Sequence, residues 1–167
     1  MLVIGLTKIV PIAITILECQ GQYLFLRRRN PPYEGLWSMV GGKVVPGEHI
    51  RQAAIREVHE ETRTTSVSDY EYRGLVTERL MNPNGALLAH FLIFVSHASI
   101  SNFEKSHREG DLELFSMKDV ASRKSEFLPS DYEMFHRFLE TDTQPRVFEA
   151  ELLRSNKGYH LVYFREP

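Results

Sequence analysis

The sequence predicts one α/β domain, and three observations carry this prediction. Apolar residues recur at helical spacing in Ile50, Ala54 and Val58, which gives a helix one flank that can pack on a sheet. Residues 86–96 form a nearly continuous apolar run, which is typical of a strand buried on both faces at the centre of a sheet. The chain has 167 residues, 43% of them hydrophobic and 25% charged, and these values suit one domain with a sizeable core.

Composition and charge argue against several classes of protein. The formal net charge of −2 disfavours a general binder of nucleic acids or anionic membranes, because such proteins normally carry a basic surplus. Cys19 is the single cysteine, so the chain has no internal disulfide and a cytoplasmic location is the simplest expectation. Residues 1–17 are apolar, but Lys8 and Pro11 interrupt them, and a membrane-spanning helix needs roughly 20 residues. We interpret this segment as a buried strand rather than a signal peptide or membrane span.

The first predicted elements are strands at residues 9–18 and 23–28, joined by a turn into a hairpin. Residues 30–35 then form a loop, because two consecutive prolines remove backbone donors and restrict the residues before them. Tyr33 lies in this loop. Packing against the core is a better interpretation of this side chain than stacking on the base of a ligand, although both are open.

The next helix carries Arg56 and the three glutamates Glu57, Glu60 and Glu61. Residues spaced i, i+3 and i+4 share one helix face, so the three carboxylates form a single acidic stripe. On an arbitrary helix such a stripe is most often a solvated face. A hard cation such as Mg²⁺ or Mn²⁺ would neutralise it, and Mg²⁺ typically leaves room for waters and substrate phosphates. The stripe therefore indicates a metal site for phosphate chemistry.

The spacing around the stripe is more specific than the stripe itself. Gly42 is followed after five residues by Glu48, and Glu48 after seven residues by residues 56–61, whose sequence is REVHEE. This pattern resembles the signature box of the Nudix (MutT-like) hydrolase family, whose members hydrolyse nucleoside diphosphates linked to another moiety. Residues 36–43 also resemble the family's approach to the box.

Two positions differ from the family pattern. Arg63 stands where the family usually has glycine, and Thr64 stands where it has an aliphatic residue. Glycine would end the helix in a left-handed conformation, in which a side chain costs on the order of 1 kcal/mol. We expect a strained or reshaped helix exit, but no carboxylate is lost. Val40, where many relatives have proline, is a milder difference.

The resemblance implies a fold and a set of site residues. The fold is the Nudix α/β/α sandwich, a mixed β-sheet flanked by helices. Glu57 and Glu61 are expected to bind Mg²⁺, with Mn²⁺ possible, while Glu60 binds metal or acts as base toward the attacking water. Arg56 orients Glu57 through a charge-assisted hydrogen bond. The resemblance further assigns the backbone carbonyl of Gly41 and Glu109, with Glu113 second, to the metal, and Arg27 or Arg28, Glu48 and Asp131 to the substrate.

Several of these assignments have a purely structural alternative. Arginines at a strand end are most often solvated, and Glu109 is equally well a solvated loop acid. Glu48 lies near the helix N-terminus, where a carboxylate is favourable in any case. Ser130, beside Asp131, is explained by capping a helix at residues 131–139.

The rest of the chain is predicted to complete the sheet and add a hairpin. Expected are strands at 70–80, 86–96 and 112–115, a short helix at 118–122, a linker at 141–145 and a C-terminal hairpin with strands at 146–154 and 159–165. We assign residues 1–140 to the Nudix domain. Residues 141–167 form an extension on the same domain, which covers a sheet edge or pairs with a second subunit in a homodimer.

The resemblance implies a Mg²⁺-dependent hydrolase that cleaves the diphosphate of a small nucleotide-type substrate, with ADP-ribose and ordinary or oxidised nucleoside triphosphates as the leading candidates. Two alternatives stay open. One is a nucleotide-sensing Nudix domain without turnover, although such domains usually lose box carboxylates. The other is a hydrolase of a non-nucleotide diphosphate.

Overall fold

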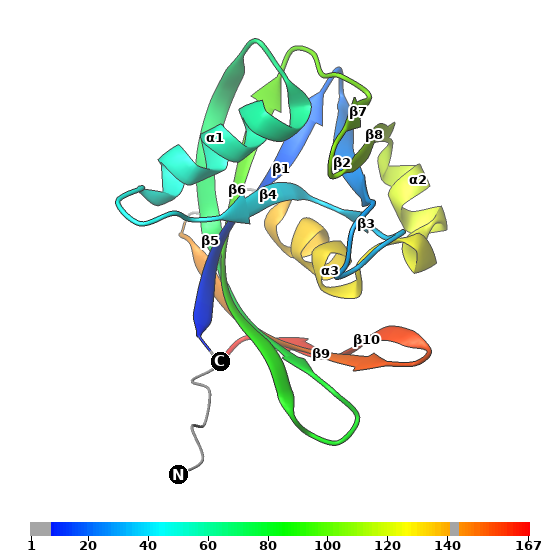
Figure 1. Cartoon of the computed structure of the whole chain (residues 1–167). Coiled ribbons are helices and arrows are strands. Elements are labelled where there is room, and N and C mark those ends of the chain that lie inside the picture. Colours follow the sequence, from blue (N-terminus) through cyan, green and yellow to red (C-terminus); the bar gives the residue numbers. More distant parts are fainter. Residues whose placement is uncertain (1–7, 141–143) are drawn as a thin grey trace.

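The computed structural model describes residues 8–140 and 144–167 as a ten-stranded sheet with helices packed on it (Figure 1). No helix in these ranges has the length and hydropathy needed to cross a bilayer. The strands are β1 (Ile9–Cys19), β2 (Gln22–Arg28), β3 (Trp37–Ser38), β4 (Val40–Lys43), β5 (Val67–Met81), β6 (Leu87–Ile100), β7 (Ser106–His107), β8 (Gly110–Phe115), β9 (Arg146–Ser155) and β10 (Gly158–Arg165). The helices are α1 (Ile50–Thr62), α2 (Met117–Ser122), the 3-10 turn η1 (Lys124–Glu126) and α3 (Pro129–Phe138).

The sheet is mixed, as expected. Its strand order is β10-β9-β5-β6-β1-β2-β8-β7, while β3 pairs with β2 and β4 with β1. β1 runs parallel to β6 and β5 runs parallel to β9, whereas β5 and β6 form an antiparallel pair. The apolar strand β6 therefore lies in the middle of the sheet, where its composition places it.

Alternation along β1 divides the core into two layers. Ala13 packs with Ala54 of α1, whereas Ile14 belongs to the cluster that contains Phe135 of α3. Successive side chains of a strand point to opposite faces, so α1 and α3 cover opposite faces of the sheet. The α/β/α sandwich is confirmed.

The C-terminal hairpin is also confirmed, and it is part of the sheet. β9 pairs with β5 along residues 146–153, which extends the sheet beyond β5 (Figure 1). Phe148 of β9 packs on Phe138 of α3 with ring centroids 5.2 Å apart, and Tyr159 of β10 packs on Tyr33 at 4.7 Å. The hairpin thus contacts both α3 and the proline-containing loop. Residues 1–7 and 141–143, to which the N-terminal strand and the linker were partly assigned, lie outside the described residues.

The predicted N-cap of α3 is wrong by two residues. The helix begins at Pro129, and Leu128 occupies the N-cap position without a side-chain hydrogen bond. Proline suits the first helical position because its fixed φ is already helical and its missing N–H would have no intrahelical partner. Ser130 therefore lies within the first turn and is fully buried.

The exit of α1 was expected to be strained or reshaped, and the structure has the strained form. Arg63 adopts φ 58° and ψ 20°, which is left-handed, and its N–H donates to the carbonyl of His59 at 3.0 Å. The helix thus ends as a glycine-capped helix would, but with a side chain in a conformation that favours glycine.

Candidate active site

The glycine pair of β4 brings the backbone close to α1. A Cβ atom on Gly42 would lie 2.5 Å from the carboxyl carbon of Glu57, and a Cβ on Gly41 would collide with the carbonyl of Ala13 in β1. A side chain on Gly42 would therefore push the strand away from the helix, and one on Gly41 would push it away from β1. Gly42 lets the acidic face of α1 lie directly against β4.

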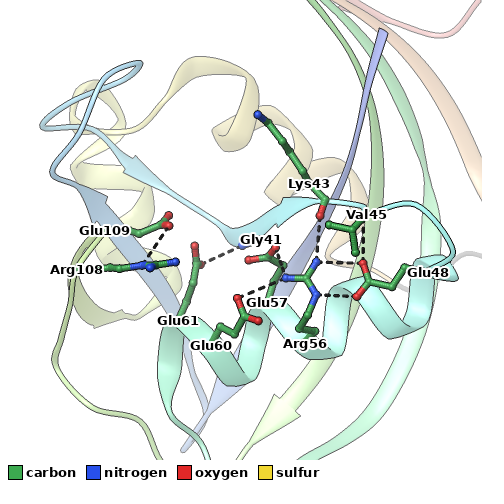
Figure 2. Close-up of polar contacts among 10 residues, drawn as sticks. All are labelled: Gly41, Lys43, Val45, Glu48, Arg56, Glu57, Glu60, Glu61, Arg108 and Glu109. Atoms are coloured by element: carbon green, nitrogen blue, oxygen red, sulfur yellow. Dashed lines mark hydrogen bonds and ion pairs between the residues drawn. The ribbon is translucent and has the colours of Figure 1, made fainter. Parts of the chain in front are cut away.

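Arg56 ties this helix to the preceding loop (Figure 2). Its Nε donates to Glu48 Oε1 at 2.6 Å, its Nη1 to Glu57 Oε1 at 2.6 Å, and its Nη2 to the carbonyl of Lys43 at 3.0 Å. The hydrogen bond from Arg56 is the main reason why the pKa of Glu48 is lowered. Glu60 Oε2 lies farther from Nη1, at 3.4 Å, and its side chain is half exposed. Arg56 thus fixes Glu57 and the loop, while Glu60 stays at the solvent edge.

Glu61 is the most buried carboxyl of the box. Only 2% of the residue is exposed, and Glu61 Oε2 accepts the N–H of Gly41 at 3.2 Å. Burial raises the pKa of Glu61 well above its ordinary value, and the nearby carboxylates of Glu109 and Glu57 raise it further. Burial also raises the pKa of Glu57, despite the opposing effect of Arg56. Negative charge is therefore under-compensated here, which is the condition that a bound cation relieves.

The oxygen donors converge from three segments. Figure 2 shows Glu57 and Glu61 from α1, Gly41 from β4 and Glu109 from the turn between β7 and β8 around one region. In residues 8–140 and 144–167, no three His, Cys, Asp or Glu side chains already stand close enough to hold a metal ion. The donor set nevertheless has the chemistry of a Mg²⁺ or Mn²⁺ site, since all its members are oxygens and two are buried acids.

A cavity of about 420 Å³ opens beside these carboxylates. This volume falls in the range of small-molecule sites, roughly 300–1,000 Å³. The residues that line it include Arg28, Tyr33, Gly41, Gly42, Lys43, Glu57, Glu78, Phe91, Glu109, Asp131 and Met134.

Residues 7–138 match the model of the NUDIX domain family. The chain belongs to the Nudix family. It is 23% identical over 133 residues to the RNA pyrophosphohydrolase of Campylobacter jejuni, covering 74% of this chain and 83% of that protein. It is 40% identical over 55 residues to the CTP pyrophosphohydrolase of Escherichia coli, covering 32% and 41%.

Among solved structures, the mutator MutT protein of Bacillus halodurans has a similar fold. Its TM-score is 0.74 at 24% sequence identity, and the match covers 95% of this chain and all of that one. The expected MutT-like Nudix fold is confirmed. Coverage this wide exceeds residues 7–138, so the structural similarity reaches into the C-terminal hairpin.

A second group of acids lines the same cavity of this Nudix domain. Asp131, in the first turn of α3, is 7% exposed, and its Oδ2 accepts the N–H of Met39 at 2.7 Å. Burial raises its pKa to about 6. Glu78 of β5 is 2% exposed, and burial, with a further contribution from Asp131, raises its pKa to about 8. We call Glu78 and Asp131 the acid pair.

Tyr33 lies beside the acid pair. Its phenol is buried, and its pKa is raised by burial and then by the charges of Glu78 and Asp131. The side chain both packs on the hairpin through Tyr159 and lines the cavity. The structure thus favours core packing for Tyr33 without removing it from the site.

Of the two arginines predicted to bind the substrate, only Arg28 lines the cavity. Its Nε donates to the carbonyl of Pro32 at 3.1 Å. Arg27 instead donates to the carbonyl of Gly35 at 3.2 Å and lies over the ring of Trp37, away from the lining residues. Glu48 is likewise outside the lining and binds Arg56, so the substrate roles of Arg27 and Glu48 stay predictions.

Sequence reasoning missed Glu78 and Lys43. Lys43 lines the cavity directly after the glycine pair. The signal for Glu78 was present in its strand, because Val76, Glu78 and Leu80 follow a period of two and all three are buried. An acid on the buried face of a predicted strand indicates either a site or an ion pair.

Proposed function

We propose that this protein hydrolyses a diphosphate linkage in a small nucleotide-type substrate with a divalent cation, Mg²⁺ or Mn²⁺. One observation carries the proposal: burial raises the pKa of both Glu57 and Glu61, and Glu57 lines a cavity of about 420 Å³ together with Glu109. Membership in the Nudix family supports it, since relatives in that family are named pyrophosphohydrolases.

Within the box, the glutamates would bind the cation and Arg56 would position Glu57. Glu57 and Glu61 would hold the cation, together with Glu109 and the backbone carbonyl of Gly41. When bound, the cation neutralises diphosphate charge and activates water, which is worth several kcal/mol in the transition state. Arg56 holds Glu57 in place through a hydrogen bond of 2.6 Å.

Glu60 takes a different position from the other glutamates. Its half-exposed carboxylate remains open to solvent beside Arg56, so it binds the cation at the outer edge or accepts the proton of the attacking water. Arg28 and Lys43, which line the cavity, supply positive charge for the substrate phosphates.

The substrate candidates are ADP-ribose and ordinary or oxidised nucleoside triphosphates. Each joins a diphosphate to a nucleoside, so each would place phosphate oxygens at the carboxylates and a base in the cavity. The polar acid pair favours a nucleotide over an isoprenoid diphosphate, because an apolar chain would leave two buried acids without partners.

We also propose that the enzyme works in the cytoplasm on a small molecule, and that nucleic acid and membrane are not its partners. The single cysteine, which is buried and free, and the net charge of −2 support this setting. Pairing of two chains through the hairpin stays a prediction.

The test is release of phosphate, pyrophosphate or a nucleoside monophosphate in Mg²⁺ or Mn²⁺ against the same reaction in a chelator. The panel is ADP-ribose, nucleoside triphosphates including 8-oxo-dGTP, dinucleoside polyphosphates, NADH and coenzyme A. We expect metal-dependent release from at least one nucleotide. Nucleotide binding without release would instead identify a sensing domain, and release only from an isoprenoid or inositol diphosphate would overturn the nucleotide assignment.

A further inference from the structure

The C-terminal hairpin of β9 and β10 lies outside residues 7–138, which match the Nudix domain model, yet it contacts the wall of the cavity. The ring of Tyr159 in β10 packs on the ring of Tyr33 with centroids 4.7 Å apart and planes at 62°. The hydroxyl of Tyr159 also accepts the backbone N–H of Tyr33 at 3.4 Å. Because Tyr33 lines the cavity, the hairpin is connected to the site through one residue.

Tyr33 depends on outside contacts for its conformation. Its φ is 70°, in the left-handed region that bulky side chains rarely adopt and that persists only where the surrounding structure holds it. Its phenol is buried and makes no hydrogen bond within the described part of the chain, so the ring is held by packing alone. The side chains that pack together there are Tyr33, Leu36, Leu80, Ala89, Leu128, Leu152, Tyr159 and Leu161.

One peptide group joins the hairpin to Arg28. The peptide between Pro32 and Tyr33 is planar, so its carbonyl and its N–H move together. The carbonyl accepts the Nε–H of Arg28 at 3.1 Å, and the N–H donates to Tyr159. Arg28, Pro32 and Tyr33 all line the cavity. A rotation of this peptide would therefore displace both the cavity wall and the Arg28 guanidinium.

We propose that Tyr159 is a positioning residue for substrate binding, which acts through the peptide between Pro32 and Tyr33 on the cavity wall and on Arg28. Tyr159 itself is not among the residues that line the cavity. The inference rests on the proposed function, in which Arg28 binds the substrate phosphates, and it gives the hairpin a role in that binding besides the extension of the sheet.

Two substitutions separate the contacts of Tyr159. Tyr159→Phe removes only the hydroxyl, whereas Tyr159→Leu removes the ring as well and keeps an apolar side chain. The matched control is Tyr163→Phe in the same strand. Its hydroxyl accepts Nη2 of Arg79 at 2.8 Å, and Tyr163 does not line the cavity. The control thus removes a shorter hydrogen bond from the hairpin without touching the cavity wall.

The first measurement is hydrogen exchange of the backbone amides of residues 33–36, which needs no ligand. We expect exchange in this loop to be at least about threefold faster in Tyr159→Phe and faster still in Tyr159→Leu, because each change lowers the free energy needed to open the loop. Tyr163→Phe should exchange like the wild type. Unchanged exchange in both Tyr159 variants would overturn the inference.

The second measurement is steady-state kinetics on the substrate found in the metal-dependence panel, with binding of the panel nucleotides measured by calorimetry in a chelator. We expect KM and Kd to rise about threefold in Tyr159→Phe and about tenfold in Tyr159→Leu, with kcat unchanged, because the wall and Arg28 act on binding. A merely structural role would lower the folded fraction, and so kcat, at constant KM. That result, or faster exchange with unchanged KM and Kd, would refute the role of Tyr159 in substrate binding.

The wild type separates this inference from the proposed function. If it binds panel nucleotides without hydrolysing them, the proposed function fails alone, and weaker binding by the Tyr159 variants still supports the inference. If it neither binds nor hydrolyses any of them, both fail.

Discussion

The box and the acid pair bury the same chemical group in two different ways. In the box, Arg56 and the N–H of Gly41 hold carboxyls whose mutual repulsion calls for a cation. In the acid pair, Glu78 has no basic partner among the described residues, and its charge is avoided by keeping the proton. Both regions line or adjoin one cavity. The comparison shows two groups of acids beside one cavity, one whose mutual repulsion a cation would relieve and one whose charge is suppressed by burial.

The largest expected effect is on turnover, and it comes from a substitution in the box that leaves the acid pair unchanged. Glu61→Gln keeps an acceptor for Gly41 N–H but removes the negative charge. We expect turnover to fall by at least about a hundredfold, because the cation supplies several kcal/mol to the transition state. The unfolding midpoint should not fall, since a buried carboxylate whose charge is disfavoured is replaced by an amide.

The measurement is steady-state kinetics on the substrate found in the metal-dependence panel, with Glu104→Gln as the exposed control. Nearly unchanged turnover of Glu61→Gln would refute the assignment of the box as the metal site. Loss of activity with loss of folding would instead mean that Glu61 acts through stability.

The same comparison explains what the sequence could predict. The box was predictable because Gly42, Glu48 and the three glutamates lie in one continuous stretch, where helical spacing alone brings carboxylates together. The long strands and the C-terminal hairpin followed from local patterns as well, whereas the short strands β3, β4 and β7 were not predicted.

The meeting of Glu78 with Asp131 could not be predicted in this way, although the resemblance had assigned Asp131 to the substrate. Tyr33, Glu78 and Asp131 come from a loop, a central strand and a helix on different parts of the chain, and only the packing of α3 on the sheet unites them. Local rules also failed at Ser130, where Pro129 moved the helix start and left the serine inside the turn. Arg27 and Arg28 were equivalent by sequence, because only the direction of each side chain separates them.

A second prediction concerns the pH dependence of stability, which should distinguish the protonated Glu78 from an ionised acid. The pKa of Glu78 is raised to about 8 in the folded chain, against about 4.3 for an unfolded glutamate, so between these values the folded state binds more protons. Its contribution to stability is therefore complete below about pH 4.3 and is lost as pH rises through 8. Glu78→Gln removes this loss. We expect its free energy of unfolding to gain about 1.4 kcal/mol on the wild type per pH unit between pH 5 and 8.

Denaturant titrations at pH 5, 6, 7 and 8 measure that gain. The control Glu104→Gln should track the wild type, since that glutamate is exposed. A difference between Glu78→Gln and the wild type that stays constant with pH would show that Glu78 is ionised in the folded protein, and the acid pair would then resemble the box.

The smallest expected effect is on stability, and it concerns the backbone at the end of α1 rather than the carboxylates of the box. Arg63 holds a left-handed conformation at φ 58°, where a side chain costs on the order of 1 kcal/mol, so Arg63→Gly should stabilise the protein by up to about 1 kcal/mol. The greater freedom of glycine in the unfolded chain opposes part of this gain. Arg51→Gly, at an exposed site in the first turn of the same helix, is the control; it adds a glycine within the helix and removes the contact of Arg51 with the Tyr70 ring, so it should destabilise by about 1 kcal/mol. Chemical denaturation compares the two, and opposite signs are the decisive result, because both changes remove an arginine and add a glycine. If Arg63→Gly also destabilised the protein, the arginine would have a stabilising contact that outweighs the strain of the left-handed exit.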